Sequence, residues 1–250
     1  TSSSTTSSSA NKRGAAYNDA SLVSALTGTG SKISWAYNWG SASSGLSSDL
    51  EFVPMLWCST DTYTSYWETN VKAAIAAGSK YILGFNEPDS PSQCDIDAST
   101  AAAAHQTYMN PYSGQVSIGA PAITNSNVAG ESIDWLDSFV SSCAGACDFD
   151  FCPVHWYNTI EAGAADLLDF VTKAQTACGD GKKVWVTEFA PNVDNPTDAE
   201  ITSFLETVQD AFDNNATYSF VERYSYFWVS DGILVNGDAA SSYGNTFAYA

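Results

Sequence analysis

Runs of mainly apolar residues recur along the chain from residue 12 onward, and each run ends in polar or aromatic side chains. Short runs of this kind, bounded by turn residues, are typical of strands. We predict eight strands, at residues 13–17, 33–39, 52–57, 81–85, 116–120, 149–157, 183–189 and 221–228. Stretches with a helical spacing of apolar residues lie between most of them, most clearly at 65–77, 98–108, 132–140, 163–177 and 199–212.

Two of the predicted helices have recognisable ends. Asp198 is placed to cap the start of the 199–212 helix, which carries Ile201, Phe204 and Leu205 on one face. Gly78 follows the 65–77 helix at the position where a left-handed residue commonly ends a helix.

The alternation of strands and helices indicates repeated βαβ units. Eight such units in about 240 residues match the size of a (β/α)8 TIM barrel, so the predicted fold class is α/β. We expect a single domain over residues 12–250, preceded by a Ser/Thr-rich linker remnant at residues 1–11. An open doubly wound sheet is the alternative, but the first strand is followed by Tyr17-Asn18-Asp19 and not by a Gly-rich phosphate loop.

Aromatic residues gather at the ends of the predicted strands, where the active site of such a barrel lies. These ends read YNW at 37–39, MLW at 55–57, HWY at 155–157 and YFW at 226–228. Aromatic faces can stack on the apolar C–H faces of sugar rings, although buried Trp and Tyr side chains fit a core equally well. Their concentration at one end of the barrel favours a sugar-binding cleft.

Two carboxylates complete this picture, since Glu87 ends the fourth predicted strand and Glu188 the seventh. Carboxylates are seldom buried unless they are paired or functional. Opposed across a barrel mouth, one protonated and the other ionised, they can act on a glycosidic bond. Asn86 is placed to hold a substrate hydroxyl beside Glu87, and Tyr157 to donate a hydrogen bond to Glu188. Two unrelated surface glutamates are the alternative interpretation.

The segments LGFNEPD (residues 83–89), HWY (155–157) and WVTEFA (185–190) together resemble glycoside hydrolase family 128. The segments ISWAYNW (33–39) and VPMLW (53–57) are similar to the early strands of that family, and the resemblance covers nearly all of residues 12–250. It implies a retaining (β/α)8 glycosidase that acts on β-1,3-glucan.

The same resemblance implies roles for individual residues. Glu87 is implied as the acid/base and Glu188 as the nucleophile of a double-displacement mechanism that needs no cofactor and no metal. The residues implied as sugar contacts are Asn86, Trp35, Tyr37, Asn38, Trp57, His155, Tyr157 and Trp228. The expected partner is β-1,3-glucan, as a polysaccharide or an oligosaccharide, and we expect a monomer.

The charge balance excludes other partners. The chain has 9 basic and 28 acidic side chains, a formal net charge of −19. Nucleic-acid binding rests on a basic footprint, and an anionic membrane surface attracts basic segments, so neither partner is expected. No apolar run approaches the roughly 20 residues that span a bilayer.

The cysteines indicate an oxidising compartment. Their spacing does not match a zinc finger, so two or three disulfides are predicted. Adjacent loops could join Cys58 to Cys94, a local loop could join Cys143 to Cys147, and Cys152 could reach Cys178, but six cysteines allow fifteen pairings. With the glycosylation sequon at 215–217, this favours a secreted or cell-wall-associated protein.

Several functional alternatives remain open at this stage. We expect endo action, but the loops at 89–98, 122–131 and 229–244 decide between an endo- and an exo-acting enzyme. A non-catalytic glucan-binding wall protein and a hydrolase of another β-glycan have the same fold pattern. His155 as a metal ligand or as the base of a serine triad is disfavoured, since no second histidine is placed beside it and no GxSxG segment is present.

Overall fold

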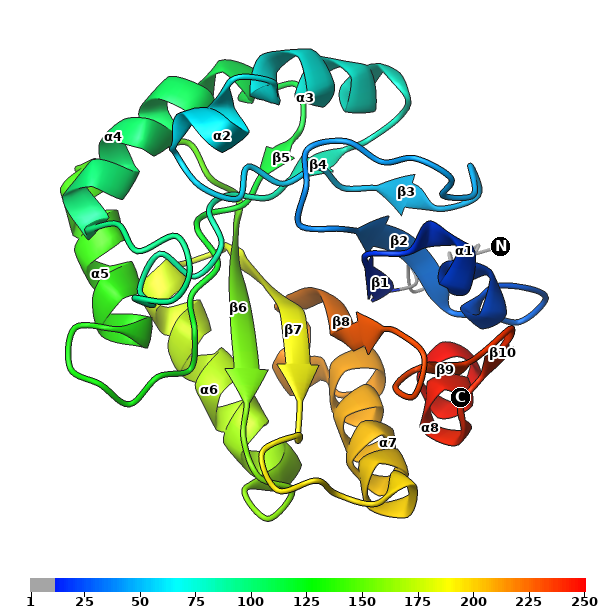
Figure 1. The fold of residues 1–250 in the computed structure, drawn as a ribbon. Coiled ribbons are helices and arrows are strands. Elements are labelled where there is room, and N and C mark those ends of the chain that lie inside the picture. Colours follow the sequence, from blue (N-terminus) through cyan, green and yellow to red (C-terminus); the bar gives the residue numbers. More distant parts are fainter. Residues whose placement is uncertain (1–11) are drawn as a thin grey trace, which may run out of the picture.

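Eight parallel strands form a closed barrel in the computed structural model, which describes residues 12–250 (Figure 1). The predicted linker at residues 1–11 lies outside the described residues. The barrel strands are β1 (Arg13–Tyr17), β2 (Ile33–Tyr37), β3 (Glu51–Phe52), β4 (Tyr81–Ile82), β5 (Ser117–Ile118), β6 (Phe151–Tyr157), β7 (Lys183–Ala190) and β8 (Val221–Val229). The predicted (β/α)8 fold is therefore confirmed, with every predicted strand in place.

Hydrogen bonding runs around the whole barrel. Six strands form one sheet in the order β3-β2-β1-β8-β7-β6, and β4 pairs with β5. Isolated parallel bridges close the two gaps, from Met55 to Leu83 between the β3 and β4 segments, and from Gly119 to Phe151 and Ile123 to Val154 between the β5 and β6 segments. All strands point the same way, so their C-terminal ends meet at one face of the barrel.

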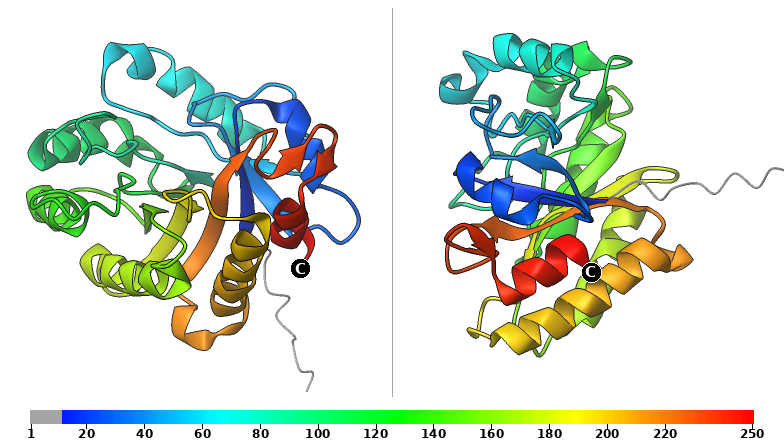
Figure 2. Two further views of the ribbon diagram at one scale, coloured as in Figure 1. Left: turned by 60° about the horizontal axis from the view of Figure 1, so that its bottom comes forward. Right: turned by 90° about the vertical axis from the view of Figure 1, so that its right-hand side faces the viewer.

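Helices surround the barrel (Figure 2). They are α1 (Ala20–Val23), α2 (Asp61–Thr64), α3 (Trp67–Ala76), α4 (Ala98–Tyr108), α5 (Ser132–Cys143), α6 (Gly163–Cys178), α7 (Asp198–Asn214) and α8 (Ser242–Tyr249). Short 3-10 turns occur at Ser24–Leu26, Asn110–Tyr112 and Ala216–Tyr218, and the small hairpin strands β9 (Val235–Asn236) and β10 (Ala239–Ala240) follow β8. The connection from β2 to β3 is a loop without a helix.

Two details of the predicted helices need correction. The start of α7 is capped by Thr197 and not by Asp198, because Thr197 and Glu200 form a reciprocal capping box. The helix predicted at 65–77 corresponds to α3, and a separate short helix that was not predicted, α2, precedes it at 61–64, with the Ser65 hydroxyl donating to the Asp61 carbonyl where the two helices are divided. The predicted end is confirmed, since Gly78 has a positive φ of 111° directly after α3.

Aromatic side chains fill the interior of the barrel. Trp35 from β2 is fully buried there, packs against Trp185 with ring centroids 5.0 Å apart and planes inclined by 50°, and donates its indole N–H to the Lys12 carbonyl. Gly14 on β1 is required by this packing, because a Cβ atom there would lie 2.2 Å from the Trp35 ring. Arg223 lies over Tyr81 at 4.2 Å and pairs with Glu51 at 2.6 Å.

Three disulfides join Cys58 to Cys94, Cys143 to Cys147 and Cys152 to Cys178. The sequence analysis named these three pairs as possible, but it could not select them from the fifteen pairings that six cysteines allow. The first bridge ties the segment after β3 to the loop after β4, where Cys94 donates its backbone N–H to the Asn86 carbonyl. It therefore constrains the loop next to Glu87.

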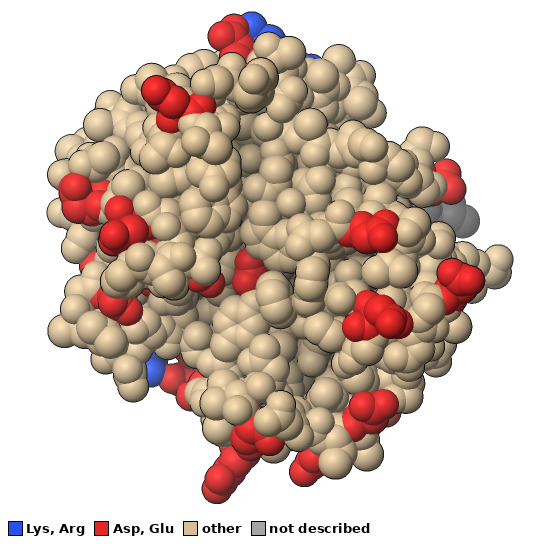
Figure 3. Space-filling view, viewed as in Figure 1, with Lys and Arg blue, Asp and Glu red and all other residues tan. Residues whose placement is uncertain are grey.

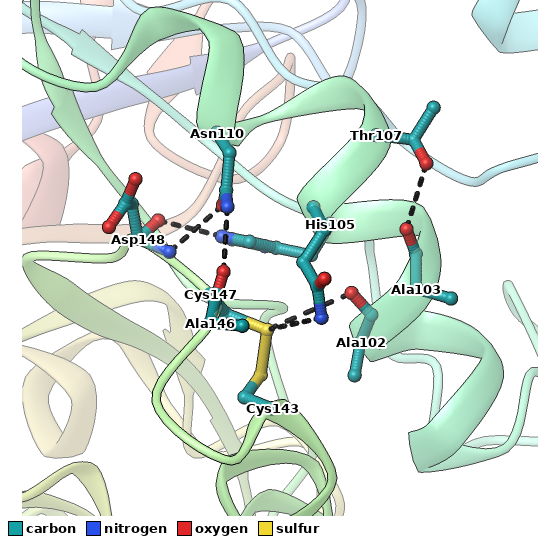
Figure 4. Close-up of a disulfide and its surroundings, with 10 residues drawn as sticks. Ala102, Ala103, His105, Thr107, Asn110, Cys143, Ala146, Cys147 and Asp148 are labelled. Atoms are coloured by element: carbon teal, nitrogen blue, oxygen red, sulfur yellow. Dashed lines mark hydrogen bonds between the residues drawn. A yellow bond between two sulfur atoms is a disulfide. The ribbon is translucent and has the colours of Figure 1, made fainter.

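A buried histidine lies beside the second disulfide (Figure 4). The Nε2 atom of His105 on α4 lies 2.8 Å from the Asp148 carbonyl, and its Nδ1 atom is buried without a hydrogen-bond partner. Burial lowers the pKa of His105 from 6.5 to about 4, against smaller opposing effects of Asp148. The neutral imidazole, donating from Nε2, is thus the form that fits the fold.

We predict that His105 makes the fold sensitive to acid. The unfolded chain takes up this proton below about pH 6.5 and the folded chain only near pH 4, so stability falls across that window. At about 1.4 kcal/mol per pKa unit the full loss is about 3 kcal/mol. Urea unfolding at pH 7 and pH 4 should show a smaller pH-dependent loss in His105→Gln than in the parent, and an equal loss would contradict the prediction.

Acidic side chains are scattered over the molecular face seen in Figure 3, and few basic side chains accompany them. This distribution fits the net charge of −19 and offers no basic patch on that face. Among the described residues, no helix combines the length and apolar character needed to cross a membrane.

Candidate active site

A cleft of about 490 Å³ lies at the end of the barrel where the strands finish. Its walls come from segments far apart in the sequence, which the parallel strands bring together at this face. It is lined by Asn18, Trp39, Trp57, Asn86, Glu87, Gln93, Tyr157, Glu188, Phe227 and Trp228. Both predicted catalytic glutamates therefore share one cleft with aromatic and amide side chains.

Glu87 occupies a constrained position just beyond β4. Its backbone φ is +43°, a left-handed conformation that is uncommon for a residue other than glycine, and its N–H donates to the Ala122 carbonyl at 2.8 Å. Such strained positions persist only where the surrounding structure fixes them, and they concentrate at functional sites. The side chain of Glu87 is 12% exposed, so it reaches the cleft while its backbone is held.

Glu188 lies on β7, and each of its carboxylate oxygens receives a hydrogen bond. The indole N–H of Trp39 donates to Oε1 at 2.7 Å, and the hydroxyl of Tyr157 donates to Oε2. Burial and the charge of Glu188 raise the pKa of Tyr157 far above its ordinary value, so its hydroxyl stays protonated and remains a donor. The carboxylate of Glu188 is thus held in one orientation.

His155 on β6 lies between the two glutamates. Its Nδ1 atom is 2.7 Å from Glu87 Oε1, and its Nε2 atom is 3.0 Å from Thr187 Oγ1 and 3.4 Å from Glu188 Oε1. Burial alone would lower the pKa of His155, but the charge of Glu188 and the hydrogen bond with Glu87 outweigh it and raise the pKa. A proton therefore resides within reach of Glu87 at higher pH than an ordinary histidine would allow.

Glu87, His155 and Glu188 also form a group that could hold a metal ion by proximity, since one ligand atom from each lies within 4.8 Å of the others. The imidazole, however, lies between the carboxylates, and its two nitrogens face different partners. A single cation would need one nitrogen and both carboxylates to converge on one point. The arrangement suits proton sharing better than metal binding.

The predicted sugar contacts divide into two groups. Asn86, Trp57, Tyr157 and Trp228 line the cleft. Within it, the side chain of Asn86 donates from Nδ2 to Gln93 Oε1 at 3.3 Å, and its Oδ1 is buried without a partner. A buried amide oxygen without a partner beside Glu87 is one of the few unsatisfied polar side-chain atoms of residues 12–250.

The other predicted contacts do not line the cleft. Trp35 belongs to the barrel core, and this corrects its prediction as a cleft residue, because its ring is fully buried against Trp185 inside the barrel. Tyr37 is also buried and donates to the Thr187 carbonyl at 2.9 Å, directly beside Glu188. Asn38 bonds Gly40 N and Ala42 O, so it shapes the turn after β2. His155 is buried under the glutamates.

The sequence analysis did not select four lining residues, namely Asn18, Trp39, Gln93 and Phe227. Three of these are visible in the sequence at the ends of the first, second and eighth strands, where polar or aromatic residues gather. Trp39 is the most consequential omission, since it contacts Glu188 directly and has a left-handed φ of 57°. Gln93 gave no signal, because its position depends on the loop that the Cys58–Cys94 bridge holds.

A closed (β/α)8 barrel with two glutamates and aromatic walls at its C-terminal face defines a glycoside hydrolase. The family model described as the glycosyl hydrolase catalytic core matches residues 14–247, and the chain belongs to this family. Its similar solved structures are enzymes of glycoside hydrolase family 128, in agreement with the resemblance seen in the sequence.

One similar solved structure is a curdlan-specific exo-β-1,3-glucanase of subgroup III from Blastomyces gilchristii, in complex with glucose. It shares 37% identity over 96% of this chain and 98% of that chain, with a TM-score of 0.84. Another is a variant of a subgroup I endo-β-1,3-glucanase from Amycolatopsis mediterranei in complex with laminarihexaose. It shares 27% identity over 95% and 98% of the two chains, with a TM-score of 0.79.

A curated relative is alkali-sensitive linkage protein 1 from Schizosaccharomyces pombe, which is 35% identical over 205 residues. This match covers 78% of the present chain but only 34% of the relative. The chain thus spans about a third of the length of that curated relative.

Proposed function

We propose that this chain hydrolyses β-1,3-glucan with retention of configuration, with Glu87 as acid/base and Glu188 as nucleophile. The observation that carries the proposal is the pairing of the two carboxyl groups across one cleft. Their oxygens approach within 4.8 Å, which fits the roughly 5–5.5 Å of retaining enzymes and leaves little room for the water that inverting enzymes place at about 6.5–9.5 Å.

In the proposed first step, Glu87 gives its proton to the glycosidic oxygen as Glu188 attacks the anomeric carbon. The bond to the leaving sugar breaks and a covalent glycosyl-enzyme forms. In the second step, the Glu87 carboxylate removes a proton from water, whose oxygen displaces Glu188 from the anomeric carbon. The hydrogen bond between His155 Nδ1 and Glu87 supports proton exchange within this pair between the steps.

Trp39 and Tyr157 support the role of Glu188 by holding both of its oxygens. Trp57, Trp228 and Asn86 are proposed to contact the sugar, the rings through their faces and the amide through hydroxyls. The similarity to solved β-1,3-glucanases supports β-1,3-glucan as the substrate. No metal or cofactor takes part in the proposed steps.

The remaining expectations form part of the same proposal. Residues 12–250 are proposed to act as a single catalytic domain and as a monomer. The three disulfides support a secreted or cell-wall-associated protein, since such bridges persist in oxidising compartments. Endo action is the primary proposal. Exo action is the second candidate, favoured by the 37% identity with a structure described as an exo-enzyme.

Incubation with laminarin, curdlan, a β-1,4-glucan and a β-1,4-mannan tests the proposal. We expect sugar release from the two β-1,3-glucans only. Oligosaccharides of mixed length at early times would support endo action, and glucose or one short product would support exo action. Binding of laminarin without any release would contradict the hydrolase proposal and favour a glucan-binding protein, while release from a β-1,4-glycan would overturn the substrate.

A further inference from the structure

A row of aromatic side chains leads out of the cleft toward α2. Trp57 lines the cleft, and its ring packs against that of Tyr63 with centroids 4.9 Å apart and planes inclined by 33°. Tyr63 is only partly buried, so it has an open side. The aromatic surface of the cleft therefore extends beyond the cleft itself.

The row continues from Tyr63 to Tyr66. Ser65 keeps helical dihedral angles after α2, with φ −58° and ψ −29°, and Tyr66, with φ −112° and ψ −5°, marks the division from α3. Residues three apart in a helical turn start from the same side of the backbone, so Tyr66 is the next aromatic residue after Tyr63 on that side. Tyr66 is 69% exposed, the highest value among the exposed large hydrophobic side chains of residues 12–250.

The α2 segment also lies on the face of the barrel where the strands end and the cleft opens. In the right-hand view of Figure 2, α2 (cyan), α1 (blue) and the β9–β10 hairpin (red) lie on the same, left-hand side of the barrel, among the connections that follow the strand ends. A chain leaving the cleft past Trp57 would therefore pass over α2. A single exposed tyrosine needs no explanation, but one that follows a ring pair leading out of a cleft does.

The charge of this segment selects the kind of ligand. Asp61 lies in the first turn of α2, and the exposed Glu68 lies two residues beyond Tyr66. The one nearby cation, Lys72, is paired with Glu68 at 2.5 Å. An anionic polymer would be repelled here, whereas a neutral polysaccharide offers C–H faces to the rings and hydroxyls to the acidic groups.

We propose that Tyr63 and Tyr66 form an accessory subsite on α2 for a neutral glucan chain that is too long for the cleft. The proposal rests on the proposed function, because the cleft must bind glucan for its continuation to matter. The subsite adds affinity for long chains only, since a short oligosaccharide that fills the cleft does not reach Tyr66.

Binding to the Glu188→Gln protein provides the test, because the ligand then stays intact. Tyr66→Ala in that background is expected to weaken the binding of long laminarin chains about three- to tenfold, and to leave laminaritriose binding unchanged. Tyr66→Phe should bind as the parent does, because the ring face is kept. Val193→Ala is the matched control, as Val193 is 61% exposed but lies in the loop after β7.

Equal binding of long chains by Tyr66→Ala and its parent would overturn the subsite and leave the proposed function intact. An equal loss for laminaritriose would also overturn it, because the effect would then arise within the cleft. If the parent bound neither ligand, the proposed function would fail together with the subsite.

Discussion

Glu188→Gln is expected to lower kcat on β-1,3-glucan by at least about a thousandfold, in line with the loss of a catalytic nucleophile in other enzymes. An amide oxygen is too weak a nucleophile to attack the anomeric carbon. The fold should be unaffected, since the amide oxygen can still accept from Trp39, and the amide nitrogen can donate to the Tyr157 hydroxyl. Initial rates of sugar release and calorimetric glucan binding measure the two effects separately.

Glu206→Gln is the matched control for this variant, because Glu206 is an exposed glutamate on α7. It should retain the parent rate. Near-normal turnover in Glu188→Gln would contradict the assignment of Glu188 as the nucleophile. A loss of glucan binding together with turnover would indicate that the substitution damages the cleft.

Glu87→Ala is expected to affect substrates according to their leaving groups. A glucosidic leaving group needs a proton from Glu87, so kcat/KM on laminarin should fall about a hundred- to ten-thousandfold. A dinitrophenyl glucoside or laminaribioside leaves without protonation, and its glycosylation step should be largely preserved. Azide, which needs no general base, should accelerate the second step and give a glycosyl azide.

The variant Glu87→Ala also removes one of the carboxylates that raise the pKa of His155. Because the Glu87 hydrogen bond helps to raise the pKa of His155, that pKa should fall in the variant. Titration of the imidazole by NMR measures this shift directly. Equal losses on the activated and natural substrates, with no effect of azide, would be incompatible with Glu87 as the acid/base.

The sequence identified the strands because their apolar runs end in an unusual set of side chains. Glu87 and Glu188 could be selected without a structure, as carboxylates at the ends of two opposed strands have few structural uses. The depth of a residue along a barrel strand was not visible in the same way. Trp35, Tyr37 and Trp39 are two residues apart, so their side chains share one face of the β2 segment. Trp35 nevertheless lies in the core, whereas Trp39 lines the cleft.

The height of each side chain along the barrel axis depends on the stagger between neighbouring strands, which is a property of the closed barrel. The alternation along β2 therefore predicts the direction in which Trp39 points, but not that it reaches Glu188. Capping shows the same limit at a local scale. Thr197 and Asp198 both suit a helix start, and the reciprocal bonds with Glu200 select Thr197.

The stereochemistry of the first product tests the central claim most directly. Proton NMR can follow the anomeric signals of a laminari-oligosaccharide during the first minutes of hydrolysis, before mutarotation mixes them. Retention by Glu87 and Glu188 predicts that the β-anomer appears first and that the α-anomer grows later. An α-anomer that appears first would mean direct attack by water, and it would contradict a covalent intermediate on Glu188.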